Sequence, residues 1–134
     1  MKYISIFFIS IFLISCQKYP HGKWKPYQIW NGPERYAHGT RNFTNQNSPL
    51  LINFLNDSLF TWKLYETNKS DTTKYELSKG HLVFFVSVSK RKIDIEIEIS
   101  DSVIIWTEME MKNGIRVPSD DGINFALKKA ELNW

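Results

Sequence analysis

Isoleucines alternate with polar residues in the centre of this chain. From Ile93 to Ser100 every second residue is isoleucine, and the residues between are aspartate, glutamate and serine. The side chains of a β-strand point alternately to its two faces, whereas an α-helix would spread these isoleucines around its circumference. The segment is therefore predicted to be a strand with one buried face.

Seven further segments have the length and apolar content of strands. They are Lys23–Trp30, Leu50–Leu55, Leu59–Glu66, Thr73–Ser78, His81–Ser89, Val103–Met111 and Ile123–Lys129. Most of them are separated by pairs of residues that favour turns: Asn56-Asp57, Lys79-Gly80, Ser100-Asp101, Asn113-Gly114 and Asp121-Gly122. No segment carries an apolar stripe of helical spacing for more than about two turns. We expect an antiparallel meander of about eight strands.

An antiparallel sheet with one apolar face has to cover that face. No helix is predicted that could do so, and the sheet must therefore pack against a second sheet or close on itself. Closure also removes the unpaired edges of the sheet. We expect an all-β fold in which the strands close into a small barrel, with an open β-sandwich as the alternative.

The register between Ile93–Ile99 and Val103–Met111 decides which face Trp106 occupies. A three-residue loop between these strands would place Glu96 opposite Trp106, whereas a two-residue turn would place Ile95 opposite Trp106. The sequence leaves both registers open. Because large aromatic side chains are usually buried, we expect Trp106 to lie in the core.

The length and charge of the chain limit its function. Its 134 residues are enough for one domain after removal of a signal sequence, and its aromatic content of 15% can supply a core. A formal net charge of +3 gives no reason to expect nucleic-acid binding. The one basic cluster, Lys90-Arg91-Lys92, is interpreted as a solvated turn, with a contact to anionic lipid headgroups as the alternative.

The first sixteen residues have the layout of a secretory signal. Lys2 precedes an apolar run, Tyr3–Ile14, that only two serines interrupt, and the small residue Ser15 precedes Cys16, the only cysteine of the chain. The run has about a dozen residues, which is short of the roughly 20 that span a membrane. Residues 1–15 are therefore predicted to be a signal peptide.

The motif Leu13-Ile14-Ser15-Cys16 resembles the lipobox of bacterial lipoproteins. The resemblance implies cleavage before Cys16 and lipidation of its thiol, with palmitate among the acyl chains. Two or more acyl chains give a stable membrane anchor. We expect residues 16–22 to form the lipidated cysteine and a tether, and residues 23–134 to form the folded domain.

The residues after the cysteine bear on the location of the protein. Gln17 stands where an aspartate would retain an enterobacterial lipoprotein in the inner membrane, and the resemblance therefore implies the outer membrane. Gln17-Lys18 is also similar to the start of the surface-export signal of Bacteroidetes lipoproteins. Tyr19-Pro20 replace the acidic residues that continue that signal. We therefore expect the periplasmic leaflet rather than the cell surface.

Gly22-Lys23-Trp24 at the start of the first predicted strand resembles the G-x-W signature of lipocalins. Asp57–Phe60 and Tyr75–Leu82 are similar to segments of small lipocalin-like lipoproteins of bacteria. The resemblance implies a lipocalin-like barrel in which Gly22 and Trp24 have structural roles and the tryptophan packs across the closed end, often under an arginine of the last strand. Here the last predicted strand offers two lysines, Lys128 and Lys129, and no arginine.

Candidates for catalysis or metal binding are few. Five carboxylates could lie close together on neighbouring strands: Asp94, Glu96, Glu98, Glu108 and Glu110. They are interpreted as solvated side chains rather than as calcium ligands. Asp120-Asp121-Gly122 is interpreted as a turn. The three histidines, His21, His38 and His81, lack the spacing of a zinc site, and no nucleophile-elbow motif occurs. We expect no enzyme, catalytic residue, metal or cofactor.

The stretch from Tyr27 to Ser48 is predicted to be the functional surface. Its roughly 20 residues show no clear periodicity, which is long for a loop in a compact domain. It contains aromatic and polar side chains of the kind used in recognition, among them His38 and the candidate ligand- or partner-binding residues Tyr27, Trp30, Tyr36, Arg41 and Phe43. The stretch is predicted to be either a lid over the barrel mouth or an aromatic plug.

Two function classes follow. The first is a monomeric, non-catalytic binding module that holds a small hydrophobic molecule of the cell envelope, because an eight-stranded barrel has room for one small ligand or for packed side chains. The second is a protein-binding lipoprotein, either an accessory subunit of an envelope assembly or an inhibitor or immunity protein.

Overall fold

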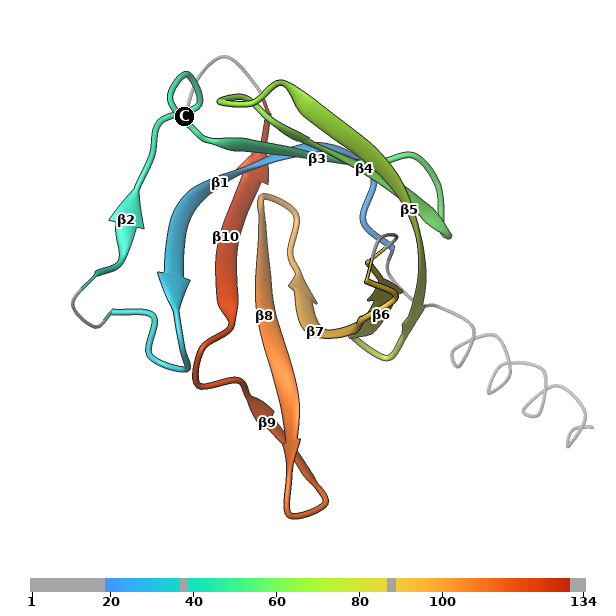
Figure 1. The fold of residues 1–134 in the computed structure, drawn as a ribbon. Helices are drawn as coiled ribbons and strands as arrows, with labels where there is room; N and C mark the ends of the chain where they lie inside the picture. The colour runs from blue at the N-terminus through green and yellow to red at the C-terminus, as the bar shows by residue number, and fades with distance from the viewer. Residues whose placement is uncertain (1–18, 37–38, 87–88, 131–134) are drawn as a thin grey trace, which may run out of the picture.

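The computed structural model describes residues 19–36, 39–86 and 89–130, which form ten β-strands (Figure 1). The strands are β1 (Gly22–Asn31), β2 (Arg41–Asn42), β3 (Leu50–Phe54), β4 (Leu59–Leu64), β5 (Lys69–Ser78), β6 (His81–Phe85), β7 (Lys92–Ile99), β8 (Val103–Lys112), β9 (Ile115–Pro118) and β10 (Ile123–Lys129). In these ranges the chain has no helix that is long and apolar enough to cross a membrane.

Eight of the strands form a closed antiparallel barrel. Around the wall they follow the order β1, β3, β4, β5, β6, β7, β8 and β10, and β10 closes the ring by pairing with both β8 and β1. The predicted all-β barrel is therefore confirmed, and the open sandwich is excluded. Strand β2 pairs with β1 outside the ring, and β9 pairs only with the far end of β8, so that the β8–β9 hairpin projects as an arm (Figure 1).

All eight predicted strands are present, but their ends differ. Strand β5 begins at Lys69 rather than at Thr73, because the polar residues that precede Thr73 also pair with β4. Strand β6 ends at Phe85 rather than at Ser89. A turn begins at Val86, and the Lys90 N–H closes it by donating to the Val86 carbonyl over 2.8 Å. The two short strands β2 and β9 were not predicted.

The connection between β7 and β8 is a two-residue turn. Ser100 N–H donates to the Val103 carbonyl over 2.9 Å and thereby closes the turn. Trp106 consequently lies opposite Ile97. Both registers considered for the sequence are wrong: the three-residue loop has the wrong length, and the two-residue alternative placed Trp106 opposite Ile95. The expectation that Trp106 lies in the core is confirmed, since it is 4% exposed.

Trp24 closes one end of the barrel. Its indole Nε1 donates to the His21 carbonyl over 2.8 Å, and Lys129 Nζ lies 5.8 Å from the centre of its ring. Lys129 thus occupies the place in which the lipocalin resemblance implied an arginine. Gly22 has a φ of 80°, which glycine adopts without strain. Pro20 is fully buried, and Tyr19 packs against the core, so that the packed structure begins before the predicted start at Lys23.

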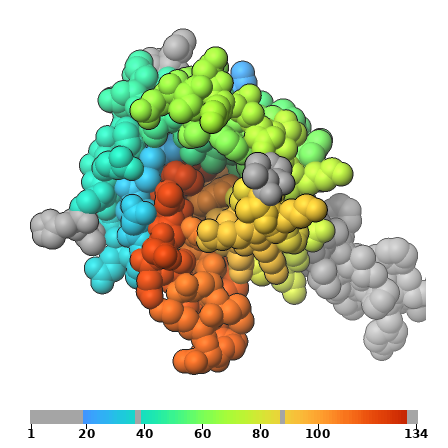
Figure 2. Space-filling view, viewed as in Figure 1, coloured from blue at the N-terminus to red at the C-terminus, as the bar shows by residue number. Residues whose placement is uncertain are grey.

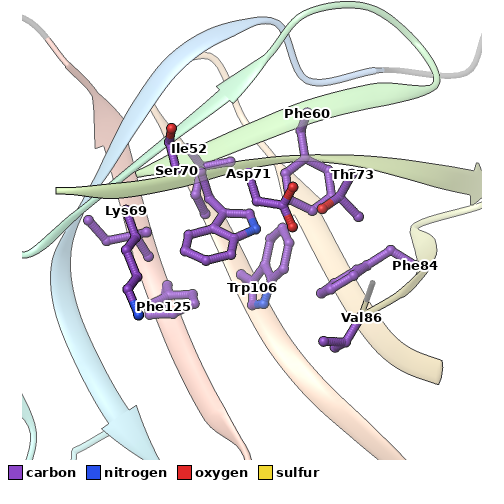
Figure 3. Close-up of a pocket in the computed structure, with 12 residues that line it drawn as sticks. Ile52, Phe60, Lys69, Ser70, Asp71, Thr73, Phe84, Val86, Trp106 and Phe125 are labelled. Atoms are coloured by element: carbon purple, nitrogen blue, oxygen red, sulfur yellow. The ribbon is translucent and has the colours of Figure 1, made fainter. Parts of the chain in front are cut away.

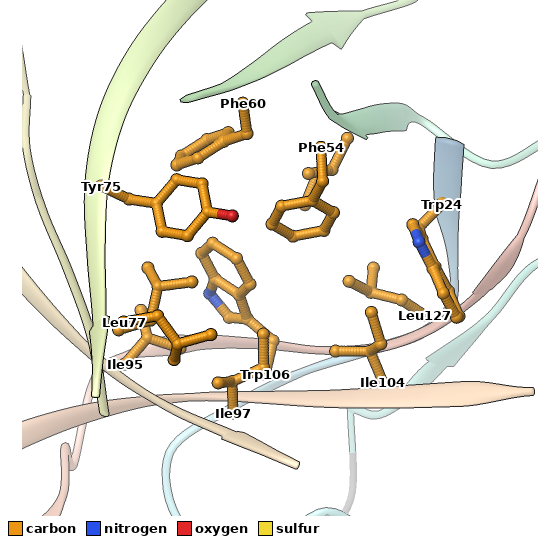
Figure 4. Packing of buried hydrophobic residues seen from close by; sticks show 12 residues of the cluster. Trp24, Phe54, Phe60, Tyr75, Leu77, Ile95, Ile97, Ile104, Trp106 and Leu127 are labelled. Atoms are coloured by element: carbon orange, nitrogen blue, oxygen red, sulfur yellow. The ribbon is translucent and has the colours of Figure 1, made fainter. Parts of the chain in front are cut away.

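Aromatic rings dominate the core inside the barrel (Figure 4). Phe54, Phe60 and Tyr75 form a triangle with ring centroids 5.7–6.0 Å apart. The Tyr75 hydroxyl donates to the Asn56 carbonyl over 2.8 Å. Burial, assisted by the charge of Asp57, raises the pKa of Tyr75 to about 12. This packing holds the wall of the barrel together at the end that carries Trp24.

Candidate functional site

The opposite end of the barrel is hollow. A cavity of about 640 Å³ opens there, at the end that carries the β4–β5 and β6–β7 connections (Figures 2 and 3). In Figure 2 the hollow lies between β10 (red) and β6 (yellow). Pockets for small molecules typically measure about 300–1,000 Å³. The cavity is therefore large enough for one small ligand.

Most of the cavity wall is apolar. The apolar lining comes from five strands of the barrel and the residue after β6: Leu50, Ile52, Phe60, Trp62, Phe84, Val86, Trp106 and Phe125. Trp106 lies at the centre of the aromatic side chains, with its ring 6.1 Å from Phe60, 6.0 Å from Phe84 and 6.2 Å from Phe125. An occupant would contact aromatic rings on several sides.

The polar part of the wall comes from one strand. Lys69, Ser70, Asp71 and Thr73, all on β5, line one side of the cavity (Figure 3). Lys69 is exposed at the mouth, and Thr73 is buried. The cavity therefore suits a molecule with an apolar body and a polar group directed toward β5. Sequence reasoning missed these four residues, because the polar first half of β5 lacks the apolar alternation of a strand.

The Tyr27–Ser48 stretch begins in the barrel wall, because residues 27–31 belong to β1, and its short strand β2 pairs with β1 outside the eight-stranded ring. A bulge at Tyr27 shifts the pairing of β1 with β10, after which Ile29 lies opposite Phe125 and Trp30 opposite Asn124. Because Phe125 faces the cavity, Trp30 faces outward. Trp30 is nevertheless buried, and β2 pairs with the neighbouring residues Gln28 and Ile29 of β1. No described residue of this stretch lines the cavity, and the structure therefore supports neither a lid nor a plug.

Arg35 organises the start of this stretch. Its Nη2 donates to the Tyr27 hydroxyl over 3.1 Å, its Nε donates to Gln28 Oε1 over 2.9 Å, and its guanidinium carbon lies 5.4 Å from the centre of the Trp30 ring. Tyr36, whose ring centre is 5.2 Å from the same carbon, is 81% exposed. Tyr27 and Trp30 therefore fix the stretch to the barrel wall, while Tyr36 stays accessible.

The remaining candidates of this stretch lie near β2. Arg41 is exposed and lies over the ring of Phe43, with its guanidinium carbon 5.9 Å from the ring centre. The structure thus places Arg41 and Phe43 together, away from the cavity. A binding role for any of the five predicted residues stays a prediction. His38 lies outside the described residues, as do the signal peptide and Cys16.

The acidic residues of β7 have a structural partner. Arg116 on β9 donates to Asp94 from Nη2 over 2.8 Å and also pairs with Glu96. Burial alone would raise the pKa of Asp94, but the hydrogen bonds and charge of Arg116 outweigh burial and hold that pKa below its usual value. Glu108 lies 3.4 Å from Arg91. Within the described ranges, no group of three or more His, Cys, Asp or Glu residues is arranged to hold a metal ion.

Comparison with known proteins adds one structural relative. The fold is similar to that of a lipocalin-like protein from Bacteroides uniformis ATCC 8492, with a TM-score of 0.51 over 81% of this chain and 96% of that protein. The two sequences are 15% identical. The fold is therefore lipocalin-like, as the sequence predicts. No protein-family model and no curated protein matches the sequence.

Proposed function

We propose that this protein is a non-catalytic binding module that holds a small, mainly apolar molecule in the open end of its barrel. The observation that carries this proposal is the cavity of about 640 Å³ with Trp106 at the centre of its aromatic side chains. Apolar pockets with a few polar groups are the usual form of small-molecule sites. The polar side chains of β5 would orient the bound molecule.

We further propose that the protein is a lipoprotein anchored through Cys16 in the periplasmic leaflet of the outer membrane. The support is the lipobox-like motif Leu13-Ile14-Ser15-Cys16 and the residues that follow it. The protein is proposed to act as a monomer, because the closed ring leaves no unpaired edge among the eight strands of the barrel.

Binding of a partner protein is the second candidate function. The β8–β9 arm carries two exposed apolar side chains near its tip, Met111 at 62% and Ile115 at 64% exposure. The two side chains lie on opposite faces of the arm, because Ile115 pairs with Lys112 and Met111 pairs with Arg116. Exposed apolar side chains are a common feature of protein-binding surfaces. An envelope protein, as an assembly partner or as the target of an inhibitor or immunity protein, would contact this arm.

A titration with N-phenylnaphthylamine, a neutral apolar fluorophore, tests the first candidate. All barrel strands lie between Gly22 and Lys129, and Tyr19 packs against the core, so that a chain from Gln17 to Trp134 contains the whole barrel. We expect one fluorophore per chain. Phe84→Ala removes a ring from the cavity wall and should weaken binding about tenfold, given the burial energy of a phenylalanine side chain.

The matched control is Phe85→Ala. Phe85 is the next residue of β6 but is 57% exposed and does not line the cavity, and its loss should leave binding unchanged. Near-ultraviolet circular dichroism verifies that both variants are folded. Absence of binding to the unsubstituted chain, or equal losses in the two variants, would contradict the proposal. If the native protein is extracted and carries no small molecule but co-purifies with a stoichiometric protein partner, the result would favour the second candidate.

A further inference from the structure

The outer face of the barrel carries a row of polar side chains across four strands. The core takes every second side chain of β1, β3, β4 and β5, and the residues between them therefore point outward. Pairing between the strands brings four outward residues into one row: Lys23 lies opposite Asn53, Asn53 opposite Thr61, and Thr61 opposite Thr72. A cation thus stands at the end of a row of amide and hydroxyl groups.

A second row runs beside the first on the same outer face. Lys63 on β4 lies opposite Ser70 on β5, and Lys25 lies two residues beyond Lys23 on β1. The Nζ atoms of Lys25 and Lys63 lie 4.8 Å and 5.5 Å from the centre of the ring of Tyr65, which follows β4. The tyrosine thus holds two ammonium groups close together. We call the two rows, with their three lysines, the outer polar face.

A groove of about 420 Å³ lies on the part of this face that β3, β4 and β5 form side by side (Figure 1). Five residues of the outer polar face line it: Asn53, Thr61, Lys63, Ser70 and Thr72. Hydroxyl and amide side chains both donate and accept hydrogen bonds. The groove therefore suits a molecule that presents many hydroxyl groups.

The lysine charges of the outer polar face are not neutralised within the described chain. Among the residues that the structure describes, Lys23, Lys25 and Lys63 form no ion pair. Two acidic residues lie nearby: Glu66 follows Tyr65 in the chain, and Asp71 lies between Ser70 and Thr72, with its Oδ1 accepting from the Thr72 N–H over 2.8 Å. Three lysines against two carboxylates leave this face positive, and it attracts anions.

The combination of groups favours one class of polyanion. Lysine is depleted in protein–protein interfaces, and a face with three lysines therefore differs from a typical protein-binding surface. Lipid headgroups would contact the lysines but would make little use of the hydroxyl groups of Thr61, Ser70 and Thr72. A sugar polymer with acidic groups satisfies both parts of the face.

We infer that the outer polar face is a second binding site, which takes an anionic polysaccharide. Its carboxylate or phosphate groups would lie against Lys23, Lys25 and Lys63, and its sugar hydroxyls would form hydrogen bonds in the groove. The site lies outside the barrel wall, and this inference therefore does not depend on the proposed binding of a small molecule inside it.

Biolayer interferometry of the Gln17–Trp134 chain on immobilised polymers tests the inference. Polygalacturonate carries a carboxylate on every sugar, dextran is a neutral sugar polymer, and polyglutamate carries carboxylates without sugar hydroxyls. We expect polygalacturonate to bind at least about tenfold more tightly than dextran at low salt, as three exposed charge pairs together allow. Polyglutamate should bind more weakly than polygalacturonate. Salt should reduce the advantage of polygalacturonate over dextran.

Two substitutions separate the contributions of charge and hydroxyl groups. Lys63→Gln should weaken binding of polygalacturonate about threefold and reduce its dependence on salt. Thr61→Val keeps the shape of the side chain but removes its hydroxyl, and should weaken binding about threefold without changing the salt dependence. The control is Lys92→Gln, because Lys92 is an exposed lysine of β7, which lies across the ring from β3. Its loss should leave binding unchanged.

Several outcomes would overturn the inference. Equal binding of dextran and polygalacturonate, or an equal loss in Lys92→Gln and Lys63→Gln, would show that these lysines form no site. Equal binding of polyglutamate and polygalacturonate would show that the face takes any polyanion. Binding to phosphatidylglycerol vesicles without binding to polygalacturonate would assign the face to a membrane surface. Binding of N-phenylnaphthylamine by the Lys63→Gln and Thr61→Val variants should be unchanged, which separates this site from the cavity.

Discussion

Arg116 on the projecting arm donates hydrogen bonds to both carboxylate oxygens of Asp94 on the barrel wall. Its Nη2 donates to Asp94 Oδ1 over 2.8 Å, and its Nε donates to Asp94 Oδ2 over 3.0 Å. Because β9 pairs only with β8, this contact and the neighbouring pair with Glu96 connect the arm to β7. The arm is thereby fixed in its direction relative to the barrel.

Replacement of Arg116 should loosen the arm. Arg116→Met leaves Glu96 without its cation and Asp94 with His81 as its remaining partner, and we expect a loss of about 1–2 kcal/mol in the free energy of unfolding, the range for hydrogen bonds to charged groups. Urea unfolding measures the change. Lys112→Met removes a more exposed lysine of the same arm, which pairs with Glu110 and Asp120, and should lower stability much less than Arg116→Met does. Equal losses would show that the Arg116 contacts contribute nothing specific.

Stability should fall at alkaline pH because of Tyr75. Its pKa is about 12 in the folded protein, mainly because the side chain is buried, and roughly 10 in an unfolded chain. The contribution of Tyr75 to stability is therefore fully present below about pH 10 and is lost as the pH rises toward 12. Urea unfolding between pH 9 and pH 12 measures the loss, which should be smaller in Tyr75→Phe. An identical alkaline slope in the two proteins would contradict the prediction.

Closure of the barrel should depend on Trp24 more than on the lysine above it. Trp24→Phe shrinks a buried ring and removes the hydrogen bond to the His21 carbonyl, and should lower the free energy of unfolding by about 2 kcal/mol. Lys129→Arg keeps the cation over the ring and should change stability by less than about 0.5 kcal/mol. Thermal unfolding of both variants gives the comparison. A larger loss in Lys129→Arg than in Trp24→Phe would refute this account of the closed end.

The proposed anchor at Cys16 makes a prediction about cell fractionation. Cys16→Ala removes the thiol that would carry the acyl chains, so that labelling with an alkynyl palmitate analogue should be lost and the protein should leave the outer-membrane fraction. Ser15→Gly keeps a small residue before the cysteine and should keep both the label and the membrane association. If the Cys16→Ala protein carries no label but is recovered in the outer-membrane fraction in the same amount as the unsubstituted protein, the proposed anchor is refuted.

The sequence predicts the strands well wherever they alternate. The alternation from Ile93 to Ile99 predicts β7, because one face of this strand is buried and the other is in contact with solvent. The register beside it was not predictable, because turns of two or three residues after Ile99 fit the alternation equally well. Strand β9 was missed because its four residues pair only with the arm.

The site was harder to predict than the fold. The sequence shows that Trp106 is buried but not whether packed side chains or an empty space lie beside it, because that depends on how eight strands close around it. Trp30 shows a second limit: its binding role stays a prediction, and the sequence does not indicate that its side chain is buried on the outer side of β1.

The packing of Pro20 and Tyr19 beside Trp24 determines which way the barrel would face on a membrane. Only Gln17 and Lys18 separate Tyr19 from Cys16, so that the three residue steps from Cys16 to Tyr19 span at most about 11 Å. A lipid on Cys16 would therefore hold the Trp24 end against the bilayer and point the open end of the cavity away from it. A ligand would then enter from the aqueous side, delivered by a carrier or by diffusion, rather than by lateral transfer from the lipid in which the protein is anchored.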